Sequence, residues 1–440
     1  MLFEKIIIYS VVIAFCILVV LVYLRSQKKA DKVVTDKIKK AKEEGLFEPV
    51  SLYPKIDLGT CIKSGACVDA CPEKDILGIL KGGGTLINAS NCVGHGACFH
   101  ACPVEAISLV IGTEKRGVDL PHVNEKYESN VEGIFIAGEL GGMGLIKNSI
   151  EQGNLAVENI QKTIKKDGKA YDLIIVGAGP AGISASLTAK KYGLKFLTLE
   201  QDSLGGTVFN FPRSKIVMTS PVDLPLHGKV KLFDTSKQEL LNLWTEVLGK
   251  NNIQIKERTK VESIQSFGNY FKVRTNQDEE FDTQTILLAI GRRGSPRKLG
   301  VPGEHLEKVA YRLLEPERIM GKKVIVVGGG DSAVEAAMSL ADENEVILSY
   351  RSDSFGRIKH KNRERLNYLL GQDKLEVVYN SNLTKIEKDN VYLKIGDEVE
   401  KPLKNDLVYI FAGGELPTQF LQKAGVMITK RFGFTMRKHA

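Results

Sequence analysis

The stretch Tyr171-Asp-Leu-Ile-Ile-Val-Gly-Ala-Gly-Pro-Ala-Gly182 combines an apolar run with three closely spaced glycines. We expect Leu173 to Val176 to form a short buried strand. In the following turn, Gly177 permits the sharp change of direction, Gly179 lets the backbone approach a pyrophosphate, and Gly182 lets the next helix lie close to the strand. The N–H groups at the start of such a helix bind phosphates.

A second apolar run, from Lys195 to Leu199, ends in Glu200. We expect a strand whose terminal carboxylate accepts a hydrogen bond from a ribose hydroxyl. Strand, glycine loop, helix, strand and acid together predict a dinucleotide site. The alternative is a tight turn with a purely structural role.

The same device recurs in Lys322-Lys-Val-Ile-Val-Val-Gly-Gly-Gly-Asp-Ser-Ala333, with Gly328, Gly330 and Ala333 at the three small-residue positions. Two such units predict two bound dinucleotides, typically a flavin and a nicotinamide.

The second unit has its own ribose strand, Glu345 to Tyr350, which has no acid at its tip. Arg351 comes next, and further basic residues lie close behind it: Arg357, Lys359, Lys361 and Arg363. Since an arginine at this position accommodates a 2′-phosphate, NADPH is favoured over NADH. The alternative is a solvated basic face.

Two more apolar strands end in small residues, Thr285-Ile-Leu-Leu-Ala-Ile-Gly-Arg-Arg-Gly294 and Leu407-Val-Tyr-Ile-Phe-Ala-Gly-Gly414. With the two glycine loops, they make the chain resemble thioredoxin reductase-like and bacillithiol-disulfide-reductase-like flavoproteins over residues 170–430. The resemblance implies an α/β fold with two Rossmann-like domains: FAD-binding over 170–292, NAD(P)-binding over 293–412, and a return to the FAD domain over 413–440. Gly291 would lie where the chain crosses between them.

Residues 113–165 resemble the segment that closes the FAD domain at the C-terminus of that family. In Val131-Glu-Gly-Ile-Phe-Ile-Ala-Gly-Glu139, Gly138 and Glu139 stand at the cofactor positions, with Glu139 in place of the usual Asp. A helix is expected from Leu140 to about Ile164. Because this segment precedes the first glycine loop, we interpret the domain as circularly permuted; the alternative is an unrelated amphipathic helix.

Leu204-Gly-Gly-Thr-Val-Phe-Asn-Phe-Pro212 is similar to the flavin-contacting segment of the bacillithiol-reductase-like branch. The resemblance implies that Gly206, Thr207 and Asn210 lie along the flavin. A Gly/Pro loop without a ligand is the alternative.

Six of the seven cysteines fall in two matching copies. Cys61-Ile-Lys-Ser-Gly-Ala-Cys67-Val-Asp-Ala-Cys71-Pro72 recurs as Cys92-Val-Gly-His-Gly-Ala-Cys98-Phe-His-Ala-Cys102-Pro103. In a chain with dinucleotide folds, this pattern indicates metal ligation rather than disulfides. It resembles a bacterial two-cluster ferredoxin, expected as an α+β domain over 55–112, in which the last Cys of each copy ligates the other cluster. One site would then use Cys61, Cys67 and Cys102, and the other Cys92, Cys98 and Cys71.

Each copy lacks one cysteine of the ferredoxin motif, with Ser64 and His95 in its place. Three outcomes stay open: Ser64 and His95 each ligate an iron, each site holds a 3Fe-4S rather than a 4Fe-4S cluster, or one site is empty. Neutral imidazole binds iron well, whereas a hydroxyl must first lose a proton.

Ile6 to Leu24 is an uncharged apolar run, long enough to span a bilayer as a helix. A cleaved signal peptide is the alternative. The Lys-rich connector over residues 25–54 carries eight Lys or Arg and four Asp or Glu between Arg25 and Glu44. Basic residues on this flank predict a single-pass protein of the cell inner membrane, with its bulk in the cytoplasm. The net charge of +8 is not spread like a nucleic-acid-binding face, so no nucleic-acid partner is expected.

No cysteine follows Cys102, which rules out a dithiol in either reductase domain. A flavin accepts two electrons together and releases them singly, as iron–sulfur clusters require. The sequence therefore predicts an NAD(P)H-dependent FAD oxidoreductase that reduces an unknown protein or quinone through Fe-S clusters. The alternatives are a non-enzymatic redox sensor or relay subunit, and an electron-feeding subunit similar to the small subunit of glutamate synthase. A homodimer is compatible with each of these three functions.

Overall fold

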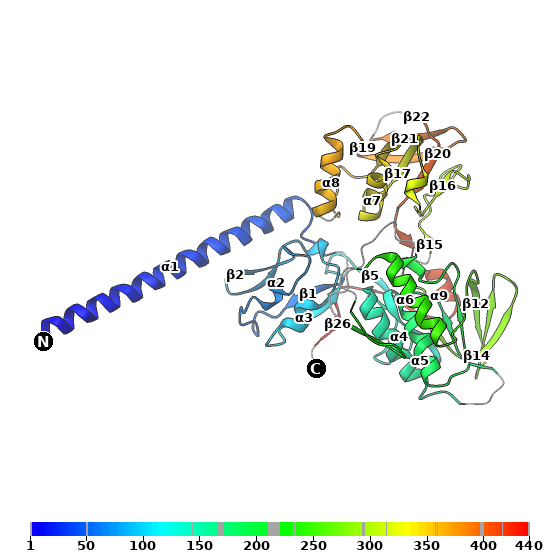
Figure 1. Ribbon diagram of the computed structural model, residues 1–440, viewed down its shortest axis with the longest axis horizontal. Coiled ribbons are helices and arrows are strands. Elements are labelled where there is room, and N and C mark those ends of the chain that lie inside the picture. Colours follow the sequence, from blue (N-terminus) through cyan, green and yellow to red (C-terminus); the bar gives the residue numbers. More distant parts are fainter. Residues whose placement is uncertain are drawn as a thin grey trace. The chain divides into compact units, whose positions relative to one another are not determined.

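The protein folds into two compact units, Met1–Lys115 with Gly433–Ala440 and Arg116–Phe432. The computed structural model describes residues 2–49, 52–142, 144–165, 170–209, 221–231, 235–292, 295–313, 315–356, 358, 360–396, 400–415 and 417–438. Figure 1 shows the α1 helix and the small sheets of the first unit, and the larger sheets and helices of the second.

The first unit combines one long helix with two small antiparallel sheets. Strand β4 lies between β1 and β26 in one sheet, and β2 pairs with β3 in the other. The elements are α1 (Leu2–Glu43), β1 (Tyr53–Ile56), α2 (Ala66–Asp69), β2 (Leu77–Leu80), β3 (Gly83–Leu86), η1 (Ala89–Asn91), α3 (Ala97–Ala101), β4 (Ile107–Ile111) and β26 (Phe434–Arg437).

Helix α1 is the one helix among the described residues that is long and apolar enough to cross a membrane. Its apolar side chains from Ile6 to Leu24 are exposed on every face. The helix continues without a break through the predicted connector and ends at Glu43, just before Gly45, whose φ of 69° suits a helix end. The connector is therefore a helix for most of its length.

The FAD-type sheet of the second unit has the order β11-β8-β7-β14-β13-β12, with β6 also paired to β14. Strands β7 and β8 confirm the two strands predicted around the first glycine loop. The elements of this part are β6 (Ile134–Ile136), β7 (Tyr171–Val176), α5 (Pro180–Lys191), β8 (Phe196–Leu199), η3 (Gly206–Val208), β9 (Val222–Leu224), β10 (Gly228–Val230), α6 (Lys237–Lys250), β11 (Ile255–Lys256), β12 (Val261–Ser266), β13 (Phe271–Thr275) and β14 (Glu280–Leu288).

The segment before the first glycine loop is part of this sheet. Strand β6 pairs in parallel with the C-terminal end of β14, and η2 (Gly138–Gly141) and α4 (Ile146–Ile160) follow it. The expected helix start at Leu140 is wrong: the α-helix begins at Ile146. The left-handed φ of 102° at Gly142 interrupts the chain between η2 and α4.

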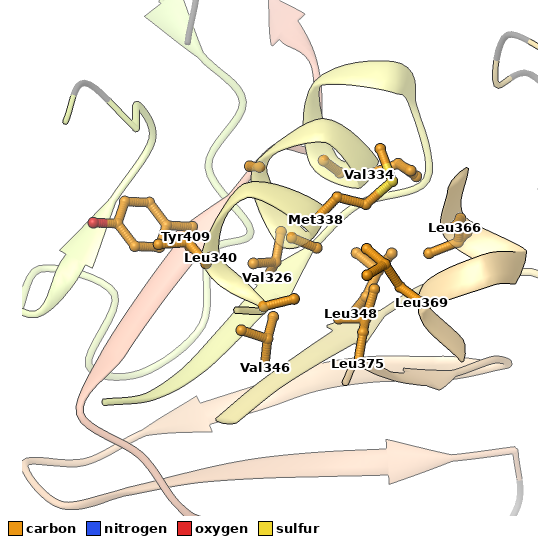
Figure 2. Packing of buried hydrophobic residues seen from close by; sticks show 14 of the residues in the cluster. Val326, Val334, Met338, Leu340, Val346, Leu348, Leu366, Leu369, Leu375 and Tyr409 are labelled. Carbon is orange, nitrogen blue, oxygen red and sulfur yellow. The ribbon is translucent and has the colours of Figure 1, made fainter. Parts of the chain in front are cut away.

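The NAD(P)-type sheet is parallel throughout, in the order β16-β23-β17-β18-β19. Figure 2 shows Val334 and Met338 of α7 packed against Val326 and Leu348 of the sheet. The elements are β16 (Val309–Ala310), η4 (Pro316–Arg318), β17 (Lys323–Val327), α7 (Asp331–Leu340), β18 (Glu345–Ser349), α8 (His360–Leu370), β19 (Glu376–Val378), β20 (Ser381–Ile386), β21 (Asn390–Ile395), β22 (Lys401–Lys404) and β23 (Leu407–Ile410).

Short strands join these parts of the second unit. Strand β15 (Ser295–Pro296) pairs with β24 (Gly414–Glu415) where the chain leaves and re-enters the FAD-type part. After α9 (Thr418–Lys423), β25 (Ile428–Arg431) pairs with β5 (Val118–Pro121).

The expected return to the FAD domain over 413–440 needs a correction at its end. Strand β26 pairs with β4 of the first unit instead, with Phe434 opposite Ile111. The edge of β4 offers unpaired backbone groups, and β26 satisfies them. The C-terminal segment thus completes the ferredoxin-like sheet.

Candidate functional site

A cavity of about 1250 Å³ lies at the C-terminal ends of the FAD-type strands. This is where parallel α/β sheets bind ligands, and its volume exceeds that of an ordinary small-ligand pocket. The cavity wall includes seven of the residues predicted from sequence to hold the flavin: Gly138, Glu139, Gly177, Gly179, Glu200, Gly206 and Gly291.

The glycines of the first loop meet different surroundings. A Cβ on Gly182 would lie 1.8 Å from the carbonyl oxygen of Gly177, and one on Gly177 would lie 2.6 Å from that of Ala289. The atom nearest to a Cβ on Gly179 would be the carbonyl oxygen of Gly205, 4.0 Å away. Gly179 itself lines the cavity. Gly177 and Gly182 therefore serve close packing, while Gly179 leaves space that fits a pyrophosphate.

The Glu200 carboxylate holds the first glycine loop through hydrogen bonds to the backbone. Its Oε2 accepts a hydrogen bond from the N–H of Ala178 (2.7 Å), and its Oε1 accepts one from the N–H of Asp202 (2.9 Å). Burial raises the pKa of the Glu200 carboxyl, while these two N–H donors oppose the rise. The carboxylate thus links the loop to the end of β8, within the cavity wall where the ribose was expected.

The segment over 134–160 forms another side of the cavity. Helix α4 lies so close to α5 that a Cβ on Gly153 would be 2.1 Å from the carbonyl oxygen of Ala181. Gln152 Oε1 accepts a hydrogen bond from the N–H of Gly138 (2.8 Å), which fixes the turn after β6. Gln152 was not predicted from sequence, because only the fold brings it to that turn.

The predicted flavin-contacting loop is described only in part. Gly206 lies in the cavity wall. The side chain of Thr207 and the whole of Asn210 lie outside the described residues. Gly291 adopts a φ of 66°, and a Cβ there would lie 3.8 Å from Glu139 Oε2, so the crossing loop and the closing segment meet at the cavity.

The second glycine loop repeats the packing of the first. Gly328 has a φ of 146°, and a Cβ there would lie 3.0 Å from the methyl of Ala333, which is fully buried. Gly330 has open space where its Cβ would be. A Cβ on Gly329 would lie 2.0 Å from the ring of Tyr350, which is itself stacked on Phe355. The Tyr350 ring therefore covers one side of this loop.

The basic residues after β18 separate into two kinds. Arg351 and Lys361 are exposed, whereas Arg363 is half-buried and donates a hydrogen bond to the carbonyl of Phe355. Arg357 and Lys359 lie outside the described residues. Of the described residues in this group, Arg351 is the arginine that directly follows the ribose strand and is open to solvent.

The six repeat cysteines form the two groups that the ferredoxin resemblance implies. Cys61, Cys67 and Cys102 surround a small pocket with Ser64. Burial raises the pKa of Cys67, with contributions from Cys61 and Cys102. Burial also raises the pKa of Cys92 to about 11, with Cys71 adding to the rise.

In the second group, burial raises the pKa of Cys98 to about 12, with Cys92 and Cys71 adding to the rise. Buried thiols that oppose each other's ionisation suit a cationic iron cluster, which stabilises thiolates. Among the described residues, no three His, Cys, Asp or Glu side chains converge on a single-ion site. In an iron–sulfur cluster each thiolate binds its own iron, so the cysteines of one site need not converge on a single point.

The two missing-cysteine positions have the same backbone setting. Ser64 lies between Lys63 (φ 61°) and Gly65 (φ 77°), and His95 lies between Gly94 (φ 77°) and Gly96 (φ 72°). Their surroundings differ: Ser64 is exposed, whereas the His95 side chain is 9% exposed with its Nε2 3.8 Å from Glu73 Oε1. His100, in the second cysteine loop, is exposed.

The comparisons with known proteins agree with both halves of this arrangement. The family model described as pyridine nucleotide-disulphide oxidoreductase matches residues 174–436. The chain belongs to this family. The model of the 4Fe-4S dicluster domain matches residues 53–103.

Known reductases are similar to part of this chain. Bacilliredoxin reductase Bdr of Bacillus subtilis is 28% identical, over 59% of this chain and 82% of that protein. A ferredoxin–NADP reductase of Ignicoccus hospitalis is 31% identical, over 42% of this chain and 57% of that protein. The solved bacillithiol disulfide reductase Bdr (YpdA) of Staphylococcus aureus has the same fold, with a TM-score of 0.52 and 23% identity over 60% of this chain and 84% of that one. The protein is an FAD-dependent oxidoreductase with an iron–sulfur domain.

Proposed function

We propose that this protein is a membrane-anchored NADPH oxidoreductase that passes electrons one at a time through two iron–sulfur sites to an acceptor at the inner membrane. The observation that carries the proposal is the distribution of cysteines: six in the iron–sulfur domain and none after Cys102. Without a thiol in either nucleotide domain, the dithiol chemistry of disulfide reductases has no place there. The ferredoxin-like domain offers the other route for the electrons.

Known relatives support an electron route between NADP and a ferredoxin-like domain. Ferredoxin–NADP reductases, by their name, join a ferredoxin to NADP, and one of them is 31% identical over 185 residues. Here a ferredoxin-like domain stands on the same polypeptide. A tethered partner acts at a high effective concentration, so one chain replaces a two-protein encounter.

The proposal assigns the following cofactor-binding roles to residues of the chain. Gly179 and the start of α5 bind the pyrophosphate of FAD, and Glu200 orients the glycine loop. Gly328, Gly330 and Ala333 shape the nicotinamide dinucleotide loop, and Arg351 holds the 2′-phosphate. FAD supplies the conversion between paired and single electrons. The cysteine groups at 61/67/102 and 71/92/98 hold the iron, with His95 as an additional ligand of the second group.

The proposed membrane anchoring rests on helix α1. Its apolar run from Ile6 to Leu24 is exposed in this structure, and burying it in lipid removes that surface from water. The basic residues after it favour the cytoplasmic leaflet, at about 1 kcal/mol per Lys or Arg near anionic headgroups. A bilayer-soluble quinone or a membrane protein is the acceptor that fits.

The test is anaerobic reduction of the full-length protein in detergent. NADPH is expected to bleach the flavin band and to produce iron–sulfur EPR signals, with steady turnover when a one-electron acceptor is added. Protein that contains flavin but neither iron nor acid-labile sulfide would refute the electron route. A sensor without turnover would reduce no acceptor, and a glutamate synthase-like subunit would co-purify with a large partner.

Anchoring is tested separately by flotation with lipid vesicles. The full chain should float, and a chain lacking residues 1–27 should stay in solution with its flavin bound. Equal partitioning of the two forms would remove the membrane from the proposal.

A further inference from the structure

The part of α1 beyond the apolar run packs against the iron–sulfur domain. From Arg25 to Glu43, the residues that are not fully exposed are Asp31, Val34, Ile38 and Ala41, and Ala41 is 1% exposed. Their spacing of three and four places them on one face of the helix. The lysines of this segment are exposed. The helix is therefore a stiff support for the domain rather than a loose tether.

Strand β2 and its flanks run along this face in the direction opposite to the helix. Asp75, before β2, pairs with Lys37 at 2.5 Å. A Cβ on Gly78 would lie 3.1 Å from Val34 Cγ1, and the N–H of Lys81, after β2, donates to Asp31 Oδ1 at 3.2 Å. Figure 1 shows β2 beside the C-terminal part of α1. The chain from Asp75 to Lys81 thus points toward the apolar end of the helix.

The first cysteine group lies at that end. A Cβ on Gly84 of β3 would be 3.8 Å from Cys67 Sγ, and Gly84 pairs with Ile79 of β2. A Cβ on Gly82, at the tip of the hairpin, would be 3.2 Å from Lys63 Nζ, which belongs to the first cysteine loop. The tip of the β2–β3 hairpin therefore contacts both Asp31 and the loop that carries Cys61, Ser64 and Cys67.

The second cysteine group lies at the other end. The N–H of Ser90 donates to the carbonyl of Leu46, beyond the end of α1, and Cys92 follows two residues later. A Cβ on Gly94 would lie 2.9 Å from Leu52 Cβ. The loop of Cys92 and Cys98 is thus held by contacts to Leu46 and Leu52. Asp31 and Ala41 are separated by about 15 Å along the helix at 1.5 Å per residue.

We infer that the site of Cys61, Cys67 and Cys102 is the membrane-facing one, and that the site of Cys71, Cys92 and Cys98 is held farther from the bilayer. This inference rests on the proposed membrane anchoring. Asp31 follows Leu24 by seven residues, which is about 10 Å of helix, so the hairpin tip stands close to the headgroups. An acceptor in the bilayer would meet the site whose fourth position is the exposed Ser64.

The test uses the full-length holoprotein in vesicles that carry a gadolinium chelate on a lipid headgroup. Ser64→Cys and His95→Cys each add a thiolate to one site and so identify its EPR signal. The signal changed by Ser64→Cys is expected to relax at least twofold faster with the gadolinium lipid, and the signal changed by His95→Cys less so. Equal enhancement, or the reverse order, would overturn the inference.

A second measurement does not depend on the clusters. Ile62 and Val93 occupy the same position in the two copies and are 60% and 37% exposed. A fluorescent amino acid at position 62 should transfer energy to a headgroup-labelled lipid more efficiently than the same residue at position 93. Transfer that is equal, or greater from position 93, would contradict the proposed order.

The role of α1 as a support is tested by a five-residue Gly/Ser insertion between Gln27 and Lys28. It should abolish the difference between positions 62 and 93, whereas the same insertion after Gly268, in the turn between β12 and β13, should leave it intact. A difference that survives the first insertion would refute the support. Failure to float with vesicles would instead count against the proposed anchoring.

Discussion

Glu200 Oε2 accepts a hydrogen bond of 2.7 Å from the backbone N–H of Ala178, inside the first glycine loop. With Oε1 bound to the N–H of Asp202, both carboxylate oxygens face donors. A glutamine has only one oxygen to offer, so Glu200→Gln leaves one of these buried N–H groups facing an amide nitrogen.

The expected result of Glu200→Gln is an FAD affinity at least tenfold weaker, which corresponds to about 1.4 kcal/mol. Titration of the apoprotein with FAD, followed by flavin fluorescence, measures it. Glu257→Gln, at an exposed position of the next segment, is the control and should bind FAD normally. An unchanged dissociation constant for Glu200→Gln would show that the carboxylate does not organise the loop.

Alanine at Gly179 and at Gly182 should have opposite effects on folding and on binding. At Gly182 the new Cβ would lie 1.8 Å from a carbonyl oxygen, so we expect a loss of stability of about 3 kcal/mol, the upper end of what overpacking costs. At Gly179 the nearest atom is 4.0 Å away, so the fold should be kept while the methyl takes the space of the pyrophosphate. Thermal unfolding and bound flavin per chain separate the two; a stable, flavin-loaded Gly182→Ala protein would contradict this packing.

Glu304 should make stability depend on pH in the acid range. Its carboxylate accepts hydrogen bonds from the N–H groups of Leu299 (2.8 Å) and Gly300 (2.7 Å) and from the hydroxyl of Tyr311 (2.7 Å). Burial acts to raise the pKa of Glu304, but these hydrogen bonds outweigh it and the pKa is lowered from 4.5. The stabilisation is therefore complete above pH 4.5 and is lost as the pH falls through the lowered pKa.

Glu304→Gln is expected to lower the free energy of unfolding by about 1 kcal/mol at neutral pH, since a partly buried donor loses its acceptor. The difference from the natural protein should shrink as the pH falls below 4.5. Thermal unfolding across this pH range is the measurement, and Glu307→Gln, an exposed neighbour, is the control. A difference that stays constant with pH would exclude Glu304 as the titrating group.

Arg351→Ala tests the choice of nicotinamide cofactor. Loss of a charged hydrogen bond to a 2′-phosphate costs about 1.5–3 kcal/mol, so kcat/KM for NADPH should fall at least tenfold. The value for NADH, which lacks that phosphate, should change less than twofold. Arg365→Ala, at an exposed position of α8, should alter neither. Equal losses with both cofactors would show that Arg351 does not read the phosphate.

Much of the candidate site could be read from local patterns. The glycine loops, the strands β7, β8, β17 and β18, and the cysteine repeat are each specified within short stretches, because turns, phosphate loops and cluster loops depend on residues that are neighbours in sequence. The segment over 134–160 was recognised by resemblance, and its position in the sheet depends on pairing with β14.

Other features had only a faint signal in the sequence. The stripe of Asp31, Val34, Ile38 and Ala41 has helical spacing, but it contains a charge and an alanine and lies among lysines. The break between Leu140 and Ile146 depends on the left-handed conformation of Gly142. A glycine adopts left-handed and right-handed conformations about equally readily, so its presence alone does not predict a break. The place of β26 had no signal, since a four-residue strand carries little information about its partner.

By itself, the sequence determined the chemistry of this protein: two dinucleotide loops, six thiols in two copies of one motif, no thiol beyond Cys102, and an apolar run at the N-terminus. These depend on residue type and short spacing. Tertiary structure alone decided that Phe434–Arg437 completes the ferredoxin-like sheet and that α1 supports that domain. Those features are contacts between residues far apart in the chain, which form only when separate elements bury surfaces against each other.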